Sequence, residues 1–219
     1  MADKLKTRAK AHTRYYTTDG ELVVGVTTVC GLLAKPQLIK WANNLGLQGI
    51  DSTKYVDASA TVGTLIHYLV ECHIKGENPD LSEYSQADQE LGQVGFNKFL
   101  EWEKEHKVEY IASELSLVSD KNKFGGTIDC IAKVDGELTL IDFKSGSGIY
   151  KEYYVQTSAY KELAKEKGYK VKRIMILNIG RNENETFKVE SITSQASKYY
   201  KIFKALKQIY YIKKELKWN

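Results

Sequence analysis

At 219 residues the chain is long enough for one compact domain, and 42% hydrophobic residues supply a full core. The net charge of +4 is the small difference between 32 basic and 28 acidic side chains, so overall charge does not by itself predict a polyanionic partner. No apolar stretch reaches the roughly 18 residues that span a bilayer, and the polar start lacks the apolar centre of a secretory signal. We therefore expect a soluble, cytoplasmic protein.

The three cysteines, Cys30, Cys72 and Cys130, are an odd number at long and irregular spacings. This pattern matches neither a zinc-ligand set nor a disulfide framework. It is typical of a chain that folds in a reducing compartment.

The predicted elements begin after a basic, unpatterned and flexible stretch that reaches about Tyr16. Apolar periodicity, capping residues and turn residues then indicate helices and strands in alternating blocks. The expected helices are 28–33, 36–46, 62–74, 81–107, 153–167 and 194–217. The expected strands are 21–26, 110–118, 124–134, 137–144, 171–179 and 186–192.

This order predicts an α/β fold with one central mixed sheet covered by helices on both faces. We expect an N-terminal helical region over residues 1–61 and a core over residues 62–219 that includes the C-terminal helix. Both would belong to one compact domain.

The strand expected at 137–144 carries an anomaly. It is nearly all apolar, as a strand buried on both faces should be, yet it contains Asp142 and Lys144. Burying unpaired charges costs free energy, so these two side chains need partners, a metal ion or a wet cleft.

The neighbouring hairpin can supply the partners. Asp135-Gly136 is a strong two-residue turn, which places Val134 opposite Glu137 and, counting outward, Asp129 opposite Asp142. Directly opposed residues have Cβ atoms about 4.5–5.5 Å apart, so both carboxylates could reach one divalent ion.

Two further charged residues fall on the same face by this count. Lys144 lies two residues beyond Asp142 and should be opposite Thr127. If the preceding turn is an even-length loop centred on Asp120-Lys121, Glu114 is also opposite Thr127, on the other neighbouring strand. The sequence thus predicts one patch with three acids and a lysine.

Such a patch suits metal-assisted hydrolysis of a phosphodiester. Carboxylate oxygens bind Mg²⁺ or Mn²⁺, which lower the pKa of a bound water and stabilise charge on the phosphate. The lysine would orient that water or help to deprotonate it. The alternative is a buried salt bridge between Lys144 and one carboxylate, and the surplus of acids argues against it.

At these residues the sequence resembles the PD-(D/E)XK nuclease superfamily, as Gly126-Thr-Ile-Asp129 followed by Ile141-Asp142-Phe-Lys144, with Glu114 upstream. Within the superfamily it is similar to the RecB-like exonuclease branch, which includes phage exonucleases and the mitochondrial genome maintenance exonuclease. Two further elements of that branch are matched, Gln156-Thr-Ser-Ala-Tyr160 and Gly63-Thr-Leu-Ile-His67-Tyr-Leu-Val-Glu71. The matches cover residues 62–167, with a weaker likeness at 35–42.

The resemblance implies a role for each matched residue. Asp129 and Asp142 would be metal ligands, the main-chain carbonyl of Phe143 another, and Lys144 would position the attacking water. Glu114 would act through a second metal ion or a water. His67 would lie near the metal or the scissile phosphate, and Gln156 and Tyr160 would brace the site.

Each of the smaller motifs has a simpler alternative. His67 taken alone could be a packed or surface histidine, and Gln156 and Tyr160 could be an ordinary i, i+4 pair. Some relatives hold an iron–sulfur cluster with four cysteines, whereas this chain has three, so we expect no cluster.

Contacts to the substrate are expected from polar and basic side chains around the patch. These candidates are Thr127, Ser145, Lys121, Lys123, Arg173 and Arg181. The C-terminal helix interleaves lysines with aromatic residues, which suits a groove for a nucleic-acid strand but also an amphipathic helix packed on the sheet.

The sequence therefore predicts a nuclease dependent on Mg²⁺ or Mn²⁺ that hydrolyses DNA from an end, with single strands or DNA ends as its partner and no membrane. A phage origin, in the cytoplasm of the host, is consistent with the resemblance. One alternative is an endonuclease on the same fold; another is a noncatalytic DNA-binding accessory protein of recombination or repair. RNA as the substrate is a third.

Overall fold

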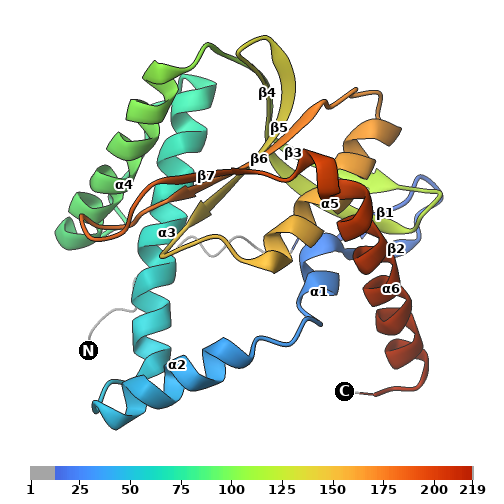
Figure 1. Cartoon of the computed structure of the whole chain (residues 1–219), viewed down its shortest axis with the longest axis horizontal. Helices are drawn as coiled ribbons and strands as arrows, with labels where there is room; N and C mark the ends of the chain where they lie inside the picture. Colours follow the sequence, from blue (N-terminus) through green and yellow to red (C-terminus); the bar gives the residue numbers. More distant parts are fainter. Residues whose placement is uncertain (1–12, 219) are drawn as a thin grey trace.

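A computed structural model describes residues 13–218 and shows one mixed sheet with helices on both faces (Figure 1). The predicted α/β fold is confirmed. Most of the flexible start expected before Tyr16 lies outside the described residues. Tyr15 and Tyr16 themselves form a short strand, β1, which the sequence pattern did not predict.

Most elements lie close to their predicted positions. The strands after β1 are β2 Leu22–Gly25, β3 Val108–Ser119, β4 Phe124–Val134, β5 Glu137–Ser145, β6 Arg173–Ile179 and β7 Lys188–Ser191. The helices are α1 Val26–Cys30, α2 Pro36–Leu47, α3 Ser52–Lys75, α4 Gln86–Glu105, α5 Lys151–Glu166 and α6 Ala196–Glu215, with a 3₁₀ turn at Thr193–Gln195.

The sheet has the order β1-β2-β4-β5-β6-β7, and β3 pairs with β4. The pairs β2–β4 and β5–β6 are parallel, and the others are antiparallel. One edge of β4 is followed by β3 along nearly its whole length. The other edge is shared, because β5 pairs with its C-terminal half and β2 with its first two residues.

Each face of the sheet has its own hydrophobic core. Helices α1, α5 and α6 cover one face, around fully buried Phe124, Leu163 and Phe203. Helices α3 and α4 cover the other, around Phe99 and Ile141 (Figure 1). Strand β5 is therefore buried on both sides, which explains its apolar sequence.

Helix α3 is ten residues longer at its start than the apolar pattern predicts. Its N-cap, Asp51, accepts hydrogen bonds from the main-chain N–H groups of Thr53 and Lys54, and Gly76 ends it in a left-handed conformation with φ 68°. The first turns project beyond the core, so their side chains are exposed and carry no helical pattern. The division predicted between residues 61 and 62 lies within α3, so one continuous helix joins the two regions.

No helix within residues 13–218 is long and apolar enough to cross a membrane.

Candidate active site

The site lies where β4 and β5 separate. The predicted hairpin register is confirmed from Val134–Glu137 to Cys130–Ile141, where the pairing of the two strands ends. Beyond that point the edge of β4 is taken by β2, at Gly25 and Gly125. The next residues along the two strands are Asp129 and Asp142, so the fork in the sheet opens between the two predicted metal ligands.

Asp142 is completely buried and pairs with Lys144. The Lys144 ammonium lies 2.6 Å from Oδ2 of Asp142, and Gln156 donates a long hydrogen bond of 3.4 Å to Oδ1. Burial raises the pKa of Asp142 against the opposing effect of Lys144, and Asp129 raises it further. Burial lowers the pKa of Lys144, but the two carboxylates outweigh it and the pKa is raised. The salt bridge considered as an alternative is thus present.

Asp129 is the second acid at the fork and lies outside the Asp142–Lys144 salt bridge. Its carboxylate accepts a hydrogen bond of 2.9 Å from the main-chain N–H of Phe143. By the hairpin register that N–H would otherwise lie opposite Ile128, so the carboxylate occupies the place where the ladder opens. Asp129 is half-buried and lines a cleft, so it keeps access to solvent and to a ligand.

Glu114 is shifted by two residues from its predicted partner. The pairs Ser113–Cys130 and Leu115–Ile128 place it opposite Asp129, not Thr127. The reason is the loop at 120–123, which is closed by the pair Ser119–Phe124 and is centred one residue later than predicted. The correction brings Glu114 nearer to the acids at the fork.

The backbone of Glu114 has φ 48°, the left-handed region that residues other than glycine rarely adopt. Ala112 and Leu115 both pack against the core under α1, α5 and α6, although residues three apart on a regular strand lie on opposite faces. The alternation of side chains along β3 is therefore irregular around Glu114. An irregular backbone here lets the carboxylate turn into the cleft, which it lines.

Helix α5 braces Asp142 from the sheet face under α1 and α6. Gln156 also donates to the hydroxyl oxygen of Tyr160 at 3.0 Å. Tyr160 packs where Gly126 has no side chain, and a Cβ there would lie 2.6 Å from its ring. Burial raises the pKa of Tyr160 well above its usual range, with Asp142 and Asp129 adding to the effect, so the phenol stays neutral.

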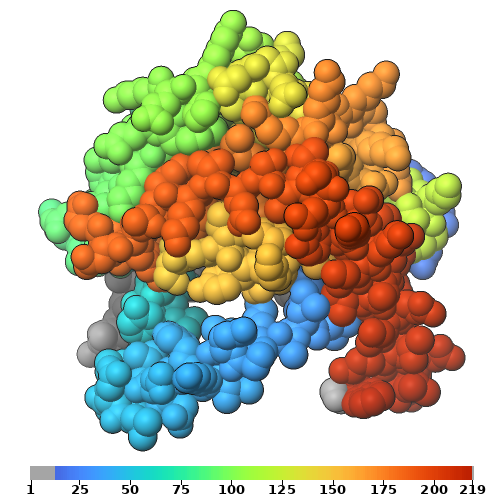
Figure 2. Space-filling model, in the orientation of Figure 1, coloured from blue at the N-terminus to red at the C-terminus, as the bar shows by residue number. Residues whose placement is uncertain are grey.

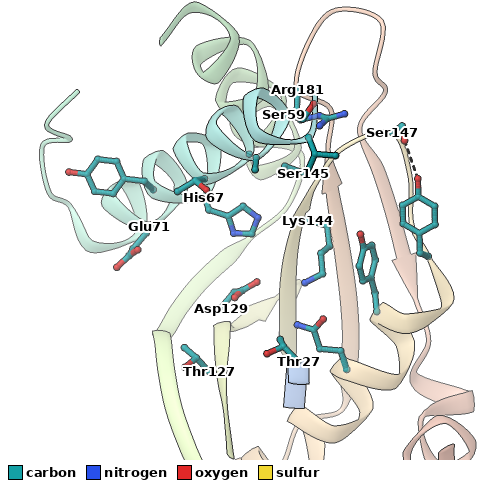
Figure 3. A pocket seen from close by; sticks show the side chains of 18 of the residues that line it. Thr27, Ser59, His67, Glu71, Thr127, Asp129, Lys144, Ser145, Ser147 and Arg181 are labelled. Carbon is teal, nitrogen blue, oxygen red and sulfur yellow. Dashed lines mark hydrogen bonds between the residues drawn. The ribbon is translucent and has the colours of Figure 1, made fainter. Parts of the chain in front are cut away.

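Helix α3 brings His67 to the opposite wall of the cleft. Its ring meets Phe143 edge to face, with ring centroids 6.4 Å apart. The helix approaches β5 closely because Gly63 has no side chain; a Cβ there would lie 2.4 Å from Oγ of Ser145. Figure 3 shows His67, Asp129 and Lys144 pointing into the same cavity.

The cavity is a cleft of about 1450 Å³ between the fork, α2, α3 and the start of α5. Nine of the predicted residues line it: His67, Glu114, Thr127, Asp129, Lys144, Ser145, Gln156, Tyr160 and Arg181. The guanidinium of Arg181 is held by Glu185 at 2.6 and 3.0 Å. Asp142 and Phe143 lie beneath the floor.

Three of the predicted phosphate contacts do not line this cleft. Arg173 donates to the main-chain carbonyl of Val134 and so fastens β6 to the hairpin at the far end of β5. Lys123 pairs with Glu21 at 2.8 Å, and Lys121 lies on the same loop at the outer end of β4. These residues have structural or surface positions away from the site.

The C-terminal helix is an amphipathic packing helix. Phe203 is fully buried in the core under α5, and several tyrosines of α6 pack against that core. Lys207 donates to the main-chain carbonyl of Asn122. None of the described residues of α6 lines the cleft, so of the two alternatives the structure supports packing over a strand-binding groove.

The sequence of the chain matches the family model of the PD-(D/E)XK nuclease superfamily over residues 40–216. The chain belongs to the PD-(D/E)XK nuclease superfamily. No curated protein matches it in a direct comparison.

Solved structures similar to this chain share little sequence with it. A candidate exonuclease from Eubacterium rectale is 10% identical with a TM-score of 0.49, over 67% of this chain and 68% of that one. An alkaline exonuclease from Laribacter hongkongensis is 11% identical with a TM-score of 0.39, over 89% of this chain and 93% of that one. The Laribacter exonuclease in complex with dAMP is 13% identical with a TM-score of 0.38 over the same shares.

PD-(D/E)XK nucleases generally use divalent metal ions. The carboxylates at the fork are ligands of the type that such an ion binds. Oδ2 of Asp142 is buried and, although Lys144 lies beside it, accepts no well-directed hydrogen bond within the described chain. Asp129 supplies a second carboxylate in the cleft. No three His, Cys, Asp or Glu side chains in residues 13–218 are already gathered at metal-binding distances. The site therefore offers oxygen ligands from two acids, which must turn toward a bound ion.

Two aromatic residues of the site were missed by sequence reasoning. The Tyr15 hydroxyl lies 3.1 Å from Oγ1 of Thr127, and the Tyr153 ring lies 5.0 Å from the Lys144 ammonium. Tyr153 could have been found, because it precedes Gln156 by three residues on the same helical face. The sequence did not indicate a site role for Tyr15, because Tyr15 belongs to an unpatterned stretch and its contact lies 112 residues along the chain.

Proposed function

We propose that this PD-(D/E)XK nuclease is an exodeoxyribonuclease that depends on Mg²⁺ or Mn²⁺ and hydrolyses DNA phosphodiesters from an end. Its reacting centre would be the fork, with Asp129 and Asp142 as ligands of the ion, the carbonyl of Phe143 as a further ligand and His67 beside them. A bound divalent ion supplies an activated water and stabilises charge on the phosphate. The hard oxygen ligands favour Mg²⁺ or Mn²⁺ over softer metals.

The remaining side chains hold the reactants in place. Lys144 carries a positive charge at the floor of the cleft, where it can hydrogen-bond the attacking water and approach a phosphate oxygen. Gln156 and Tyr160 fix the orientation of Asp142. Glu114, opposite Asp129, is placed to accept a proton from water or to hold a second ion.

The observation that carries the choice of an end is the bridge formed by α2. Lys35, just before α2, pairs with Glu152 of α5 at 2.7 Å, and α2 leads into the first turns of α3 on the other wall. Three residues of α2 line the cleft from the outside: Gln37, Leu38 and Trp41. Figure 2 shows an opening between this bridge and the body of the molecule. A free end can pass under such a bridge, whereas a closed circle cannot.

The test compares linear single strands, linear duplex and closed circles, all end-labelled or stained, with Mg²⁺, Mn²⁺ or EDTA. We expect loss of linear DNA only, dependent on the metal and absent in Asp142→Ala. Cutting of closed circles by the wild type would replace the exonuclease with an endonuclease. Binding without cleavage under every metal condition would leave a noncatalytic DNA-binding protein.

A further inference from the structure

The outer part of the cleft carries aromatic side chains on both walls. Trp41 of α2 and Tyr55 of α3 line one wall, and Tyr150 and Tyr153 at the start of α5 line the other. None of these four residues belongs to the acid, lysine and glutamine set at the fork. Trp41 and Tyr55 lie on the side of the opening that α2 and α3 form. Tyr150 and Tyr153 lie on the opposite side, at the start of α5.

The α5 wall leads outward from the reacting centre. The Lys144 ammonium lies over the Tyr153 ring at 5.0 Å from its centre. The Tyr153 and Tyr150 rings then meet edge to face, with centroids 5.7 Å apart. The Tyr150 hydroxyl lies 3.1 Å from Oγ of Ser147 in the loop after β5, which holds the outer ring in place.

The opposite wall is a second edge-to-face pair. The Trp41 and Tyr55 rings have centroids 5.7 Å apart and planes inclined by 68°. In this geometry a ring face is left open, and Tyr55 and Tyr150 are 46% and 48% exposed. Exposed rings on both walls of one cleft cost free energy in water, so they fit a flat apolar ligand better than they fit solvent.

Arg181 lines the same cleft as the two aromatic walls. Its pKa is raised mainly by the hydrogen bonds that it donates to Glu185, so the guanidinium keeps its positive charge. Lys98 fixes the Arg181–Glu185 turn by donating to the main-chain carbonyls of Asn182 and Glu185 at 2.6 Å each. Figure 3 places Arg181 near Ser145 and Ser147, on the other side of Lys144 from Thr127.

We propose that these rings form a binding site for unpaired nucleobases of the substrate strand, next to the nucleotide that is cut. Trp41, held edge-on by Tyr55, stacks on a base from one side and Tyr150 from the other, while Arg181 lies beside the backbone. Each base has an apolar face, so stacking of this kind holds a strand without reading its sequence. Bases in a duplex already stack on one another, so the site selects single strands. This inference rests on the proposed nuclease function.

The test scans one abasic position at a time along a 5′-labelled single-stranded 12-mer, with binding measured by fluorescence anisotropy in EDTA so that no cleavage occurs. For the wild type we expect one or two positions at which loss of the base weakens binding about tenfold. Trp41→Leu should weaken binding of the intact 12-mer by a similar factor and abolish the sensitivity at one of those positions. Trp218→Leu changes an exposed tryptophan outside the cleft and should behave as the wild type.

Two outcomes would overturn the inference. The first is an abasic scan in which no position weakens binding to the wild type, or in which Trp41→Leu shows the same sensitive positions as the wild type. The second is a duplex that binds to the wild type as tightly as the single strand does. Both are read without metal, so they are independent of cleavage. If the wild type cuts linear DNA but the scan is flat, the nuclease stands and the base-stacking site falls.

Discussion

Asp142 and Lys144 depend on each other for stability. The Lys144 ammonium lies at the floor of the cleft, and Oδ2 of Asp142 lies 2.6 Å from it, fully buried beneath the floor. Removing one partner leaves the other charge without its counterion. We expect Lys144→Met to lower the free energy of unfolding by about 3 kcal/mol, and Asp142→Asn/Lys144→Met to recover most of this loss.

Urea denaturation of Lys144→Met, of Asp142→Asn and of the double variant measures this coupling. All three variants should lose cleavage activity. The double variant should therefore be inactive although it keeps most of its stability. Additive losses in the double variant would mean that the two groups do not interact in solution as the structure places them.

Glu114 combines backbone strain with a side chain that lines the cleft. Its φ of 48° suits glycine better than glutamate. Glu114→Gly should therefore leave the free energy of unfolding unchanged or raise it by about 1 kcal/mol, while cleavage falls sharply. Lys123→Gly is the matched control, because Lys123 has φ 53° and does not line the cleft. Wild-type cleavage in Glu114→Gly would remove Glu114 from the reacting centre.

Residue positions could be predicted where a short turn fixed the register. Asp135-Gly136 allows one hairpin pairing, so Asp129 and Asp142 were placed correctly. Glu114 was placed two residues off because the length of the preceding loop was assumed. The positions of Lys123 and Arg173 were unpredictable for a different reason: their partners, Glu21 and Val134, are chosen by packing far along the chain.

At the scale of elements, the contact between β4 and α5 decides how Asp142 is oriented. A Cβ on Gly126 would meet the Tyr160 ring at 2.6 Å and a Val26 methyl at 3.2 Å. We expect Gly126→Ala to destabilise the chain by about 1–3 kcal/mol and to reduce cleavage, because Tyr160 and Gln156 must move together.

Gly46→Ala is the matched control for this variant. Gly46 lies within α2 with nothing within 4 Å of its Cβ position, so alanine should stabilise the helix by up to about 1 kcal/mol. Thermal melting and cleavage rates of the two variants give the comparison. Equal behaviour of the two would contradict the close packing of α5 on β4.

The elements themselves were largely predictable because buried strands and amphipathic helices carry their own periodicity. The structure departs from the pattern where an element projects from the core. The first turns of α3 are exposed, so they lack an apolar stripe and the pattern predicts the helix only from Val62 onward. Strand β1 was missed because two residues are too few to show alternation.

At the scale of the whole molecule, the sheet, the bridge and the cleft form one arrangement. The fork brings two acids together, with Asp142 buried beneath the cleft and Asp129 open to it. Residues of α2 line the approach. Single-stranded linear DNA should therefore be degraded faster than blunt duplex. Time courses with equal concentrations of ends measure the ratio, and faster loss of blunt duplex would contradict the narrow passage.

Asp129 and Asp142 are proposed to form one metal-dependent reacting centre. The most direct test is the initial rate of cleavage of end-labelled single-stranded DNA in Mg²⁺ or Mn²⁺ by the wild type, Asp129→Asn and Asp142→Asn, each checked for folding by circular dichroism. Each amide keeps the shape of the side chain but removes the charge that holds the ion, so we predict that the rate falls by about 1000-fold in both variants. A rate near that of the wild type in either folded variant would contradict the claim.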